Sequence, residues 1–240
     1  MAIYHFSGTP ISRGKGQSSV ASAAYRSASK LYDERLDQTF DYTRKQGVVH
    51  QEVLLPDNAP AWMADREKLW NNVEATERRK DSQLAREFNI SLPKELTREQ
   101  NIELAREYIN EHFVSHGMVA DFAVHEDKSK DGELQPHAHV MLSMREVTQE
   151  GFGKKAREWN DKNNIYVWRE GWAESANKHL AMHGHDIRID HRSFKEQGID
   201  LEPQYKIGAT QSKVELARAE DHERIARENG EKLLEKPEIA

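Results

Sequence analysis

The chain has 240 residues, of which 37% are hydrophobic and 32% charged, and its formal net charge is −6. This length suits one domain with an extension, or two small domains. The absence of cysteine excludes disulfides, cysteine metal ligands and a cysteine nucleophile. No apolar run approaches the roughly 20 residues of a membrane span, and the start of the chain does not resemble a signal peptide. We therefore expect a cytoplasmic protein without membrane insertion.

The periodicity of apolar residues and the positions of turn residues predict the elements in chain order. Strands are expected at 2–6, 36–42, 48–55, 84–92, 118–125, 136–142 and 186–190, and helices at 19–31, 65–80, 98–116 and 165–183. The strands 36–42 and 48–55 are expected to form a hairpin, 150–164 a loop, and the segment from 212 a charged helix. Strands and helices in this order indicate an α+β fold, with helices packed on an antiparallel sheet.

Helix caps support two of these predictions. Ser18 precedes the first helix and Thr97 the third, and both are residues that cap helix N-termini. Glu99 or Gln100 would complete the cap at Thr97. Gly117 is expected to end the third helix.

Three histidines lie on two successive strands. In His137-Ala138-His139 the side chains alternate, so both histidines point to one face of the strand. The preceding strand delivers His125 at its end, and a turn brings the two strands together. Neutral imidazole is the commonest side-chain metal ligand, and three protein ligands with open positions are typical of a catalytic metal site.

The H-x-H pair is also compatible with chance and with a cupin. Such a pair occurs by chance in a chain with 12 histidines. Cupins also use H-x-H, but their pattern needs a Glu where Ser143 and Met144 stand, and Glu146 is too far along. The pair alone therefore does not decide between a metal site and these alternatives.

The first 32 residues contain no Asp or Glu, whereas Arg13, Lys15, Arg26 and Lys30 are present. Such a segment suits contact with a phosphate backbone, although chance clustering in a Ser-rich stretch is the alternative. Tyr25 projects here from a helix whose neighbouring side chains are small, so it is a candidate nucleophile. The alternative for Tyr25 is ordinary packing of an amphipathic helix.

Glu87 is a second candidate. Strand alternation places it opposite Phe88 and Ile90, where a carboxylate could orient a metal-bound imidazole or accept a proton from tyrosine. An exposed Glu paired with a neighbouring cation is the alternative. His5, which shares a strand face with Ile3, is a further candidate for the same site.

The chain resembles the MobA/MobL (MobQ) conjugative relaxases, and in particular the relaxase domain of TraA proteins of Ti-type transfer systems. The resemblance runs from residue 1 to about 208. It rests on the start MAIYHF and on SRGKGQS at 12–18, ASAAYR at 21–26, DYTRKQG at 41–47, QLARE at 83–87, PHAH at 136–139 and GIDLEP at 198–203.

This resemblance implies the HUH endonuclease fold, a central five-stranded antiparallel sheet flanked by helices, with the tyrosine helix before the histidine strands. It implies a relaxase domain over 1–208 and a charged helical extension or linker over 209–240. It places the nucleophile on Tyr25, the acidic residue on Glu87, and the metal ligands on His125, His137 and His139. A helicase-like region follows in TraA, so we expect a relaxase fragment without ATPase activity.

The implied activity is that of a site- and strand-specific DNA nickase at a plasmid transfer origin. Tyr25 would form a 5′-phosphotyrosine link and later rejoin the strand, with a divalent ion assisting. Mg²⁺ or Mn²⁺ is expected, and other first-row divalent ions suit the nitrogen ligands. Two alternatives are a metal-dependent hydrolytic nuclease and a non-catalytic accessory protein that binds origin DNA.

The expected partners are single-stranded and hairpin DNA, relaxosome accessory proteins and a type IV secretion coupling protein, in the bacterial cytoplasm. The residues expected to contact DNA are Arg13, Lys15, Arg26, Arg44, Lys45, Arg86 and His5. Aromatic residues that could stack on bases are Tyr32, Trp159, Tyr166 and Trp168, with core packing favoured for Trp168.

Overall fold

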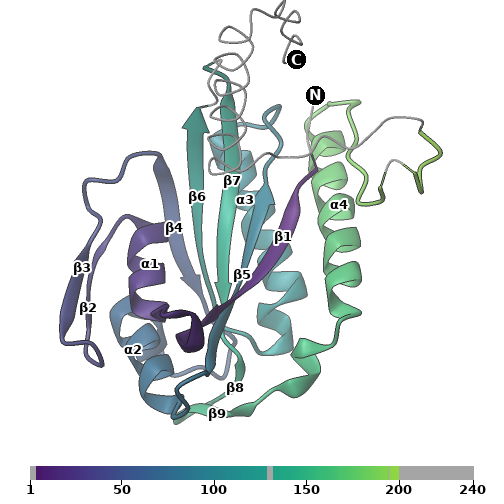
Figure 1. The fold of residues 1–240 in the computed structure, drawn as a ribbon. Helices are drawn as coiled ribbons and strands as arrows, with labels where there is room; N and C mark the ends of the chain where they lie inside the picture. The colour runs from purple at the N-terminus through teal and green to yellow at the C-terminus, as the bar shows by residue number, and fades with distance from the viewer. Residues whose placement is uncertain (1–3, 129–131, 194, 200–240) are drawn as a thin grey trace, which may run out of the picture. The chain divides into compact units, whose positions relative to one another are not determined.

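A five-stranded antiparallel sheet lies at the centre of the computed structural model (Figure 1), which describes residues 4–128, 132–193 and 195–199. The strands follow the order β1-β5-β7-β6-β4. Their bounds are Phe6–Ser12 (β1), Val48–Leu54 (β4), Gln83–Ser91 (β5), Ala120–Lys128 (β6) and Leu134–Leu142 (β7). The expected α+β class and central antiparallel sheet are confirmed. The two histidine strands, β6 and β7, lie next to each other.

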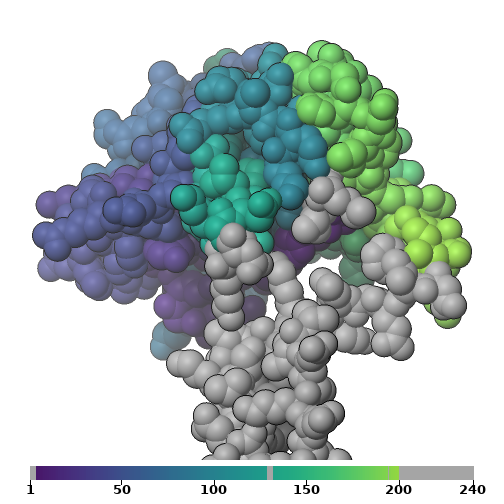
Figure 2. All heavy atoms as spheres, turned by 90° about the horizontal axis from the view of Figure 1, so that it is seen from above, coloured from purple at the N-terminus to yellow at the C-terminus, as the bar shows by residue number. Residues whose placement is uncertain are grey.

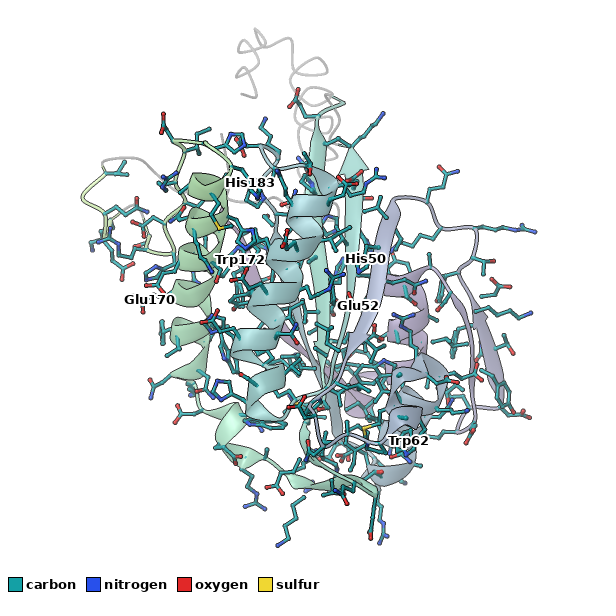
Figure 3. All side chains as sticks on the ribbon, turned by 180° about the vertical axis from the view of Figure 1, so that it is seen from behind. His50, Glu52, Trp62, Glu170, Trp172 and His183 are labelled. Atoms are coloured by element: carbon teal, nitrogen blue, oxygen red, sulfur yellow. The ribbon has the colours of Figure 1, made fainter. Side chains whose placement is uncertain are left out.

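Two helices, α3 (Arg98–His112) and α4 (Asn164–Met182), cover one face of the sheet. The predicted capping box starts α3: Gln100 N–H donates to Thr97 Oγ1, and the Gln100 side chain accepts from Thr97 N–H. Phe88 and Ile90 of β5 pack into this core with Trp172 of α4, which Figure 3 shows beside α3. This apolar layer fixes the faces of β5, β6 and β7, so their intervening residues point to the other side.

The opposite face of the sheet carries α1 (Ser19–Ser27) and α2 (Arg66–Thr76). The Ser18 side chain caps α1 by accepting from Ala21 N–H, as predicted. Val20, Trp70 and Met141 belong to the core between these helices and the sheet. The histidines of β6 and β7 lie on this same face, and His125 contacts the last turn of α1.

Two small hairpins complete the described elements. One joins β2 (Lys30–Asp33) to β3 (Gln38–Asp41), and the other joins β8 (Arg145–Thr148) to β9 (Gly151–Lys155). Short 3₁₀ helices occupy Arg13–Lys15, Ala61–Ala64, Val114–His116 and Arg157–Asn160. In Figure 2 the teal residues at the end of β6 lie between the purple-to-blue N-terminal part and green α4.

Several predicted elements are wrong in position or pairing. The first strand covers 6–12 rather than ending at 6, and α1 stops at Ser27 because Ala28 adopts a left-handed conformation (φ 50°). The strand at 48–54 pairs with β6, not with the segment before it, which pairs with β2. Residues 150–164 contain β9 rather than a single loop, and 186–190 form no strand.

The chain divides into two compact units, Met1–His191 and Arg192–Ala240. In the second unit, 195–198 form a turn in which Gly198 N–H donates to the Lys195 carbonyl. The boundary expected at 208/209 and the charged extension lie outside the described residues. Among those described, no helix combines the length and apolar character needed to cross a membrane.

Candidate metal and tyrosine site

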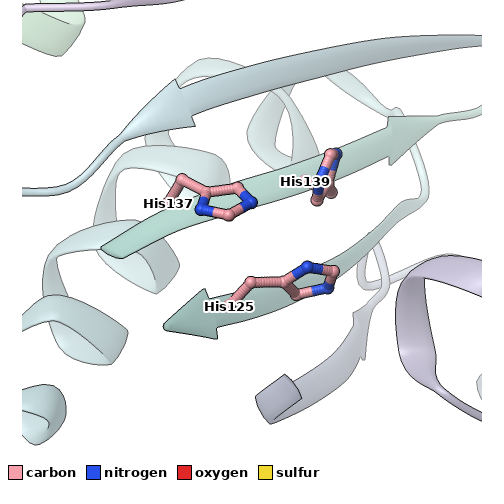
Figure 4. Close-up of side chains that lie close together, drawn as sticks. All are labelled: His125, His137 and His139. Carbon is pink, nitrogen blue, oxygen red and sulfur yellow. The ribbon is translucent and has the colours of Figure 1, made fainter. Parts of the chain in front are cut away.

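Three imidazoles converge on the α1 face of the sheet. His125 of β6 stands directly opposite His137 of β7, and His139 follows two residues along β7. Figure 4 shows the three rings turned toward one another. Their centroids lie 5.2 Å (125–137), 4.8 Å (125–139) and 5.1 Å (137–139) apart. One nitrogen of each ring lies within 4.8 Å of the others.

Each imidazole has an oxygen partner that fixes its protonation. His125 Nε2 lies 2.7 Å from the Arg26 carbonyl oxygen, His137 Nδ1 lies 3.0 Å from the Gln135 carbonyl oxygen, and His139 Nδ1 lies 3.0 Å from Glu87 Oε1. These oxygens only accept hydrogen bonds, so each contacting nitrogen carries the proton. In the neutral form of each ring the second nitrogen then has the lone pair that a metal ligand requires.

The surroundings keep two of these rings neutral. Burial lowers the pKa of His125 to about 4, and the nearby Lys45 ammonium acts in the same direction. Burial also lowers the pKa of His137. Near neutral pH these imidazoles therefore offer lone pairs rather than positive charge. The described residues thus fit a divalent cation with three nitrogen ligands.

Glu87 lies beside the histidines and is nearly buried, with 8% of its surface exposed. It accepts from His139 and from the Nε and Nη2 groups of Arg26. Burial raises its pKa, but the hydrogen bonds from His139 and Arg26 outweigh this and lower the pKa to about 2. Glu87 therefore orients His139, and so low a pKa makes it a weak proton acceptor for tyrosine.

Tyr25 lies near the end of α1, is 47% exposed and immediately precedes Arg26. The Lys45 ammonium lies 3.9 Å from the centroid of its ring and 3.1 Å from its carbonyl oxygen. The ring of Tyr42 stands edge-on at 5.2 Å. The segment after β3 thus holds the ring of Tyr25. The sequence patterns did not single out Tyr42, although it lies within the motif at 41–47.

The residues expected to contact DNA differ in exposure and in their partners within the protein. Lys15 and Arg44 are exposed. Arg13 instead donates to the carbonyl oxygens of Glu74, Glu77 and Arg79 and to the Glu74 carboxylate, at the end of α2. His5 precedes β1 and contacts the Ser7 hydroxyl. DNA contact by these residues stays a prediction.

Arg86 and the aromatic candidates have different positions. Arg86 lies over the Trp168 ring and donates to Asn160, on the face opposite Glu87. Trp159 and Trp168 are core residues with 8% exposure each, so stacking on bases is wrong for them in this conformation. Tyr32 and Tyr166 are exposed.

Comparison with known proteins places this chain in a family. The model of the MobA/MobL family matches residues 17–216. The chain belongs to the MobA/MobL family. It is 42% identical to the conjugal transfer protein TraA of Agrobacterium fabrum, over 100% of this chain and 25% of TraA. It is 38% identical to the mobilization protein MobL of Acidithiobacillus ferridurans, over 98% of this chain and 72% of MobL. The chain thus spans about a quarter of the length of its TraA relatives.

Solved structures agree with this assignment. A structure described as the molecular basis of vancomycin resistance transfer in Staphylococcus aureus is 37% identical, with a TM-score of 0.74, over 80% of this chain and 100% of that one. The metal-bound conjugative relaxase TrwC in complex with oriT DNA is 11% identical, with a TM-score of 0.51, over 95% of this chain and 85% of that one. This MobA/MobL chain therefore has the HUH relaxase fold that its sequence resemblance implied.

Proposed function

We propose that the chain is a relaxase domain that nicks one DNA strand at a plasmid transfer origin, with Tyr25 as the nucleophile. The observation that carries this proposal is the junction of α1 with the histidines. Tyr25 is exposed, and the next residue, Arg26, contacts His125 through its carbonyl group and Glu87 through its guanidinium group. The helix that carries the nucleophile is thereby attached to the candidate metal ligands.

His125, His137 and His139 would hold a divalent ion, for which Mg²⁺ and Mn²⁺ are the first candidates. Such an ion supplies positive charge that stabilises the phosphate oxygens as negative charge develops on them. The protein's own contribution is to fix the ligands. Glu87 orients His139, and the carbonyl oxygens of Gln135 and Arg26 orient the other two rings.

In the proposed reaction the Tyr25 phenol oxygen bonds to phosphorus while the bond from phosphorus to the 3′ oxygen breaks. The phenol releases a proton and the departing 3′ oxygen takes one up. The product is a 5′-phosphotyrosine and a free 3′-hydroxyl. Because one phosphodiester replaces another, the step is reversible, and the same site can rejoin the strand.

The proposed substrate is single-stranded DNA next to a hairpin at the transfer origin. Lys45, which contacts Tyr25, and the nearby Arg44 are the candidates for phosphate contacts beside Tyr25, and Lys15, which precedes α1, is a further candidate. The relaxosome proteins and the secretion coupling protein belong to the same proposal. Support for it comes from relatives that are named for conjugal transfer and mobilization.

The decisive experiment is covalent capture of labelled single-stranded oligonucleotides tiled across the origin, with Mn²⁺ or with chelator, on a denaturing protein gel. We expect a shifted band that needs metal and is absent in Tyr25→Phe, because the attacking oxygen is lost. Tyr166→Phe, another exposed tyrosine, is the matched control and should behave as the wild type. Tyr42→Phe tests whether the neighbouring phenol reacts instead.

Each alternative predicts a different gel. Cleaved DNA without a shifted band would identify a hydrolytic nuclease. Oligonucleotide binding that needs no metal, without cleavage of any tiled oligonucleotide, would identify an accessory DNA-binding protein. A shifted band that persists in Tyr25→Phe and disappears in Tyr42→Phe would move the nucleophile to Tyr42.

A further inference from the structure

Arg26 contacts both sides of the histidine cluster. Its Nε and Nη2 groups donate to the two oxygens of the Glu87 carboxylate, and its Nη1 group donates to the Ser22 carbonyl oxygen at 3.0 Å. The side chain is 20% exposed. All three nitrogens of the guanidinium group are therefore engaged within the protein.

The main chain of Arg26 makes the second link. Its carbonyl oxygen accepts from His125 Nε2 at 2.7 Å, while Glu87 accepts from His139 Nδ1 at 3.0 Å. One residue thus reaches two of the three candidate ligands, directly at His125 and through Glu87 at His139. It lies next to Tyr25 in α1.

We propose that Arg26 is a positioning residue for the metal site, which locks Glu87 and, through it, the ligand orientation of His139, and joins α1 to the ligands. The inference rests on the proposed function of the histidines as metal ligands. It differs from the phosphate contact that the basic N-terminal segment suggested. Three of the five N–H donors of this guanidinium group are engaged within the protein, by a nearly buried carboxylate and by its own helix.

The planar fork of arginine is essential to this role. Two parallel N–H groups match the two carboxylate oxygens, and a third donor reaches back four residues to Ser22. A lysine ammonium carries the same charge but cannot make this arrangement. Charge alone should therefore not replace Arg26.

The first test is Mn²⁺ affinity by titration calorimetry, on the 240-residue chain without DNA. For Arg26→Gln we expect a Kd about 10- to 100-fold weaker, the range for loss of a partner that orients a ligand. Arg26→Lys should recover only part of this loss. Tyr25→Phe should leave the Kd within about twofold, because the phenol is not among the ligands.

The matched control is Arg66→Gln. Arg66 makes the corresponding bidentate pair with Asp121, and its side chain is 15% exposed. It reaches no histidine in the contacts of the described residues. Both glutamine variants lose a partly buried pair, but only Arg26→Gln should lose metal affinity. Equal losses in both would show a general structural effect and overturn the proposal.

A double variant protects the test against misfolding. Arg26→Gln/Glu87→Gln leaves no unpaired charge, and because Arg26 acts through Glu87 its Kd should match that of Glu87→Gln within about threefold. A much weaker Kd in the double variant would overturn the route through Glu87.

DNA binding in chelator separates the two roles of Arg26. Positioning predicts that Arg26→Gln leaves the oligonucleotide Kd and its salt dependence unchanged. If Arg26 instead contacts a DNA phosphate, Arg26→Gln should bind every oligonucleotide more weakly, and the slope of log K against log salt concentration should be smaller by about one. That result together with an unchanged Mn²⁺ Kd would overturn the proposal. If the wild type binds no Mn²⁺, the metal site of the proposed function fails as well. If the wild type binds Mn²⁺ and Arg26→Gln binds it with the same Kd, only the inference about Arg26 is overturned.

Discussion

Two carboxylates on one face of the sheet can be compared directly. Glu87 of β5 and Asp121 of β6 are both paired with Met141 of the strand between them. Each is nearly buried and accepts a bidentate arginine from a helix, Arg26 of α1 or Arg66 of α2. Two carboxylate–arginine pairs of the same kind thus anchor two helices on one face of the sheet.

The third donor distinguishes the two pairs. Asp121 accepts from the indole Nε1 of Trp70 at 2.8 Å, within the core under α2. Glu87 accepts from His139, one of the three histidines that each have a nitrogen within 4.8 Å of the others. The Glu87 pair thus contacts the proposed metal site through an imidazole, whereas the Asp121 pair contacts an indole of the core. The Asp121 pair therefore serves as the reference for effects of the Glu87 pair on metal affinity that go beyond anchoring a helix.

The largest effect is expected from Asp121→Ala, which leaves Arg66 without its carboxylate. Removing one partner of a buried pair costs about 3–5 kcal/mol of unfolding free energy, measurable by urea denaturation. The Mn²⁺ affinity of the folded protein should stay within about twofold. A fall in metal affinity comparable to that of Glu87→Ala would erase the distinction between the two pairs.

A pH series should show the next effect. The hydrogen bonds from His139 and Arg26 outweigh the opposing effect of burial and hold the pKa of Glu87 at about 2. Because this lies below the ordinary value, the stabilisation is present above about pH 4.5 and is lost as the pH falls toward 2. It amounts to roughly 3 kcal/mol.

This contribution is measured as the difference in unfolding free energy between wild type and Glu87→Gln, in chelator. The difference should be constant between pH 7 and 5 and shrink below about 4.5. A difference that does not change down to pH 3 would contradict the lowered pKa.

The smallest effect is expected from Trp70→Phe. The substitution removes the Nε1 donor to Asp121 but leaves Arg66 in place, so the loss should be about 1.5 kcal/mol, as for one hydrogen bond to a charged group. Thermal unfolding measures it, and covalent capture of DNA should stay at the wild-type level. Weaker capture in the folded variant would mean that the Asp121 pair also supports the reactive end of the sheet.

The face of each central strand could be read from the sequence because side chains alternate. Phe88 and Ile90 are apolar and were expected to face the core. Alternation then put Glu87 on the opposite face of the sheet, together with the histidines. The cap at Thr97 was equally local, since Ser, Thr, Asp and Asn before a helical pattern have few other roles. These predictions depended on neighbouring residues alone.

Long-range pairings could not be read in this way. Nothing near Val48 indicates that its strand pairs with β6, more than 70 residues later. The end of α1 at Ala28 was missed because alanine rarely adopts a positive φ. The Arg26–Glu87 pair joins residues 61 positions apart, so Arg26 was assigned to DNA by the charge of its own segment.

The separation of Arg26 and His125 by 99 positions also has a consequence for synthesis. At about 5–20 residues per second, Arg26 is synthesised roughly 5–20 seconds before His125, the first histidine of the cluster. β5, which carries Glu87, follows α1, and the histidine strands come last. A nascent chain therefore contains Tyr25 well before it contains any of the candidate metal ligands, so the proposed site can assemble only after the histidine strands have been synthesised.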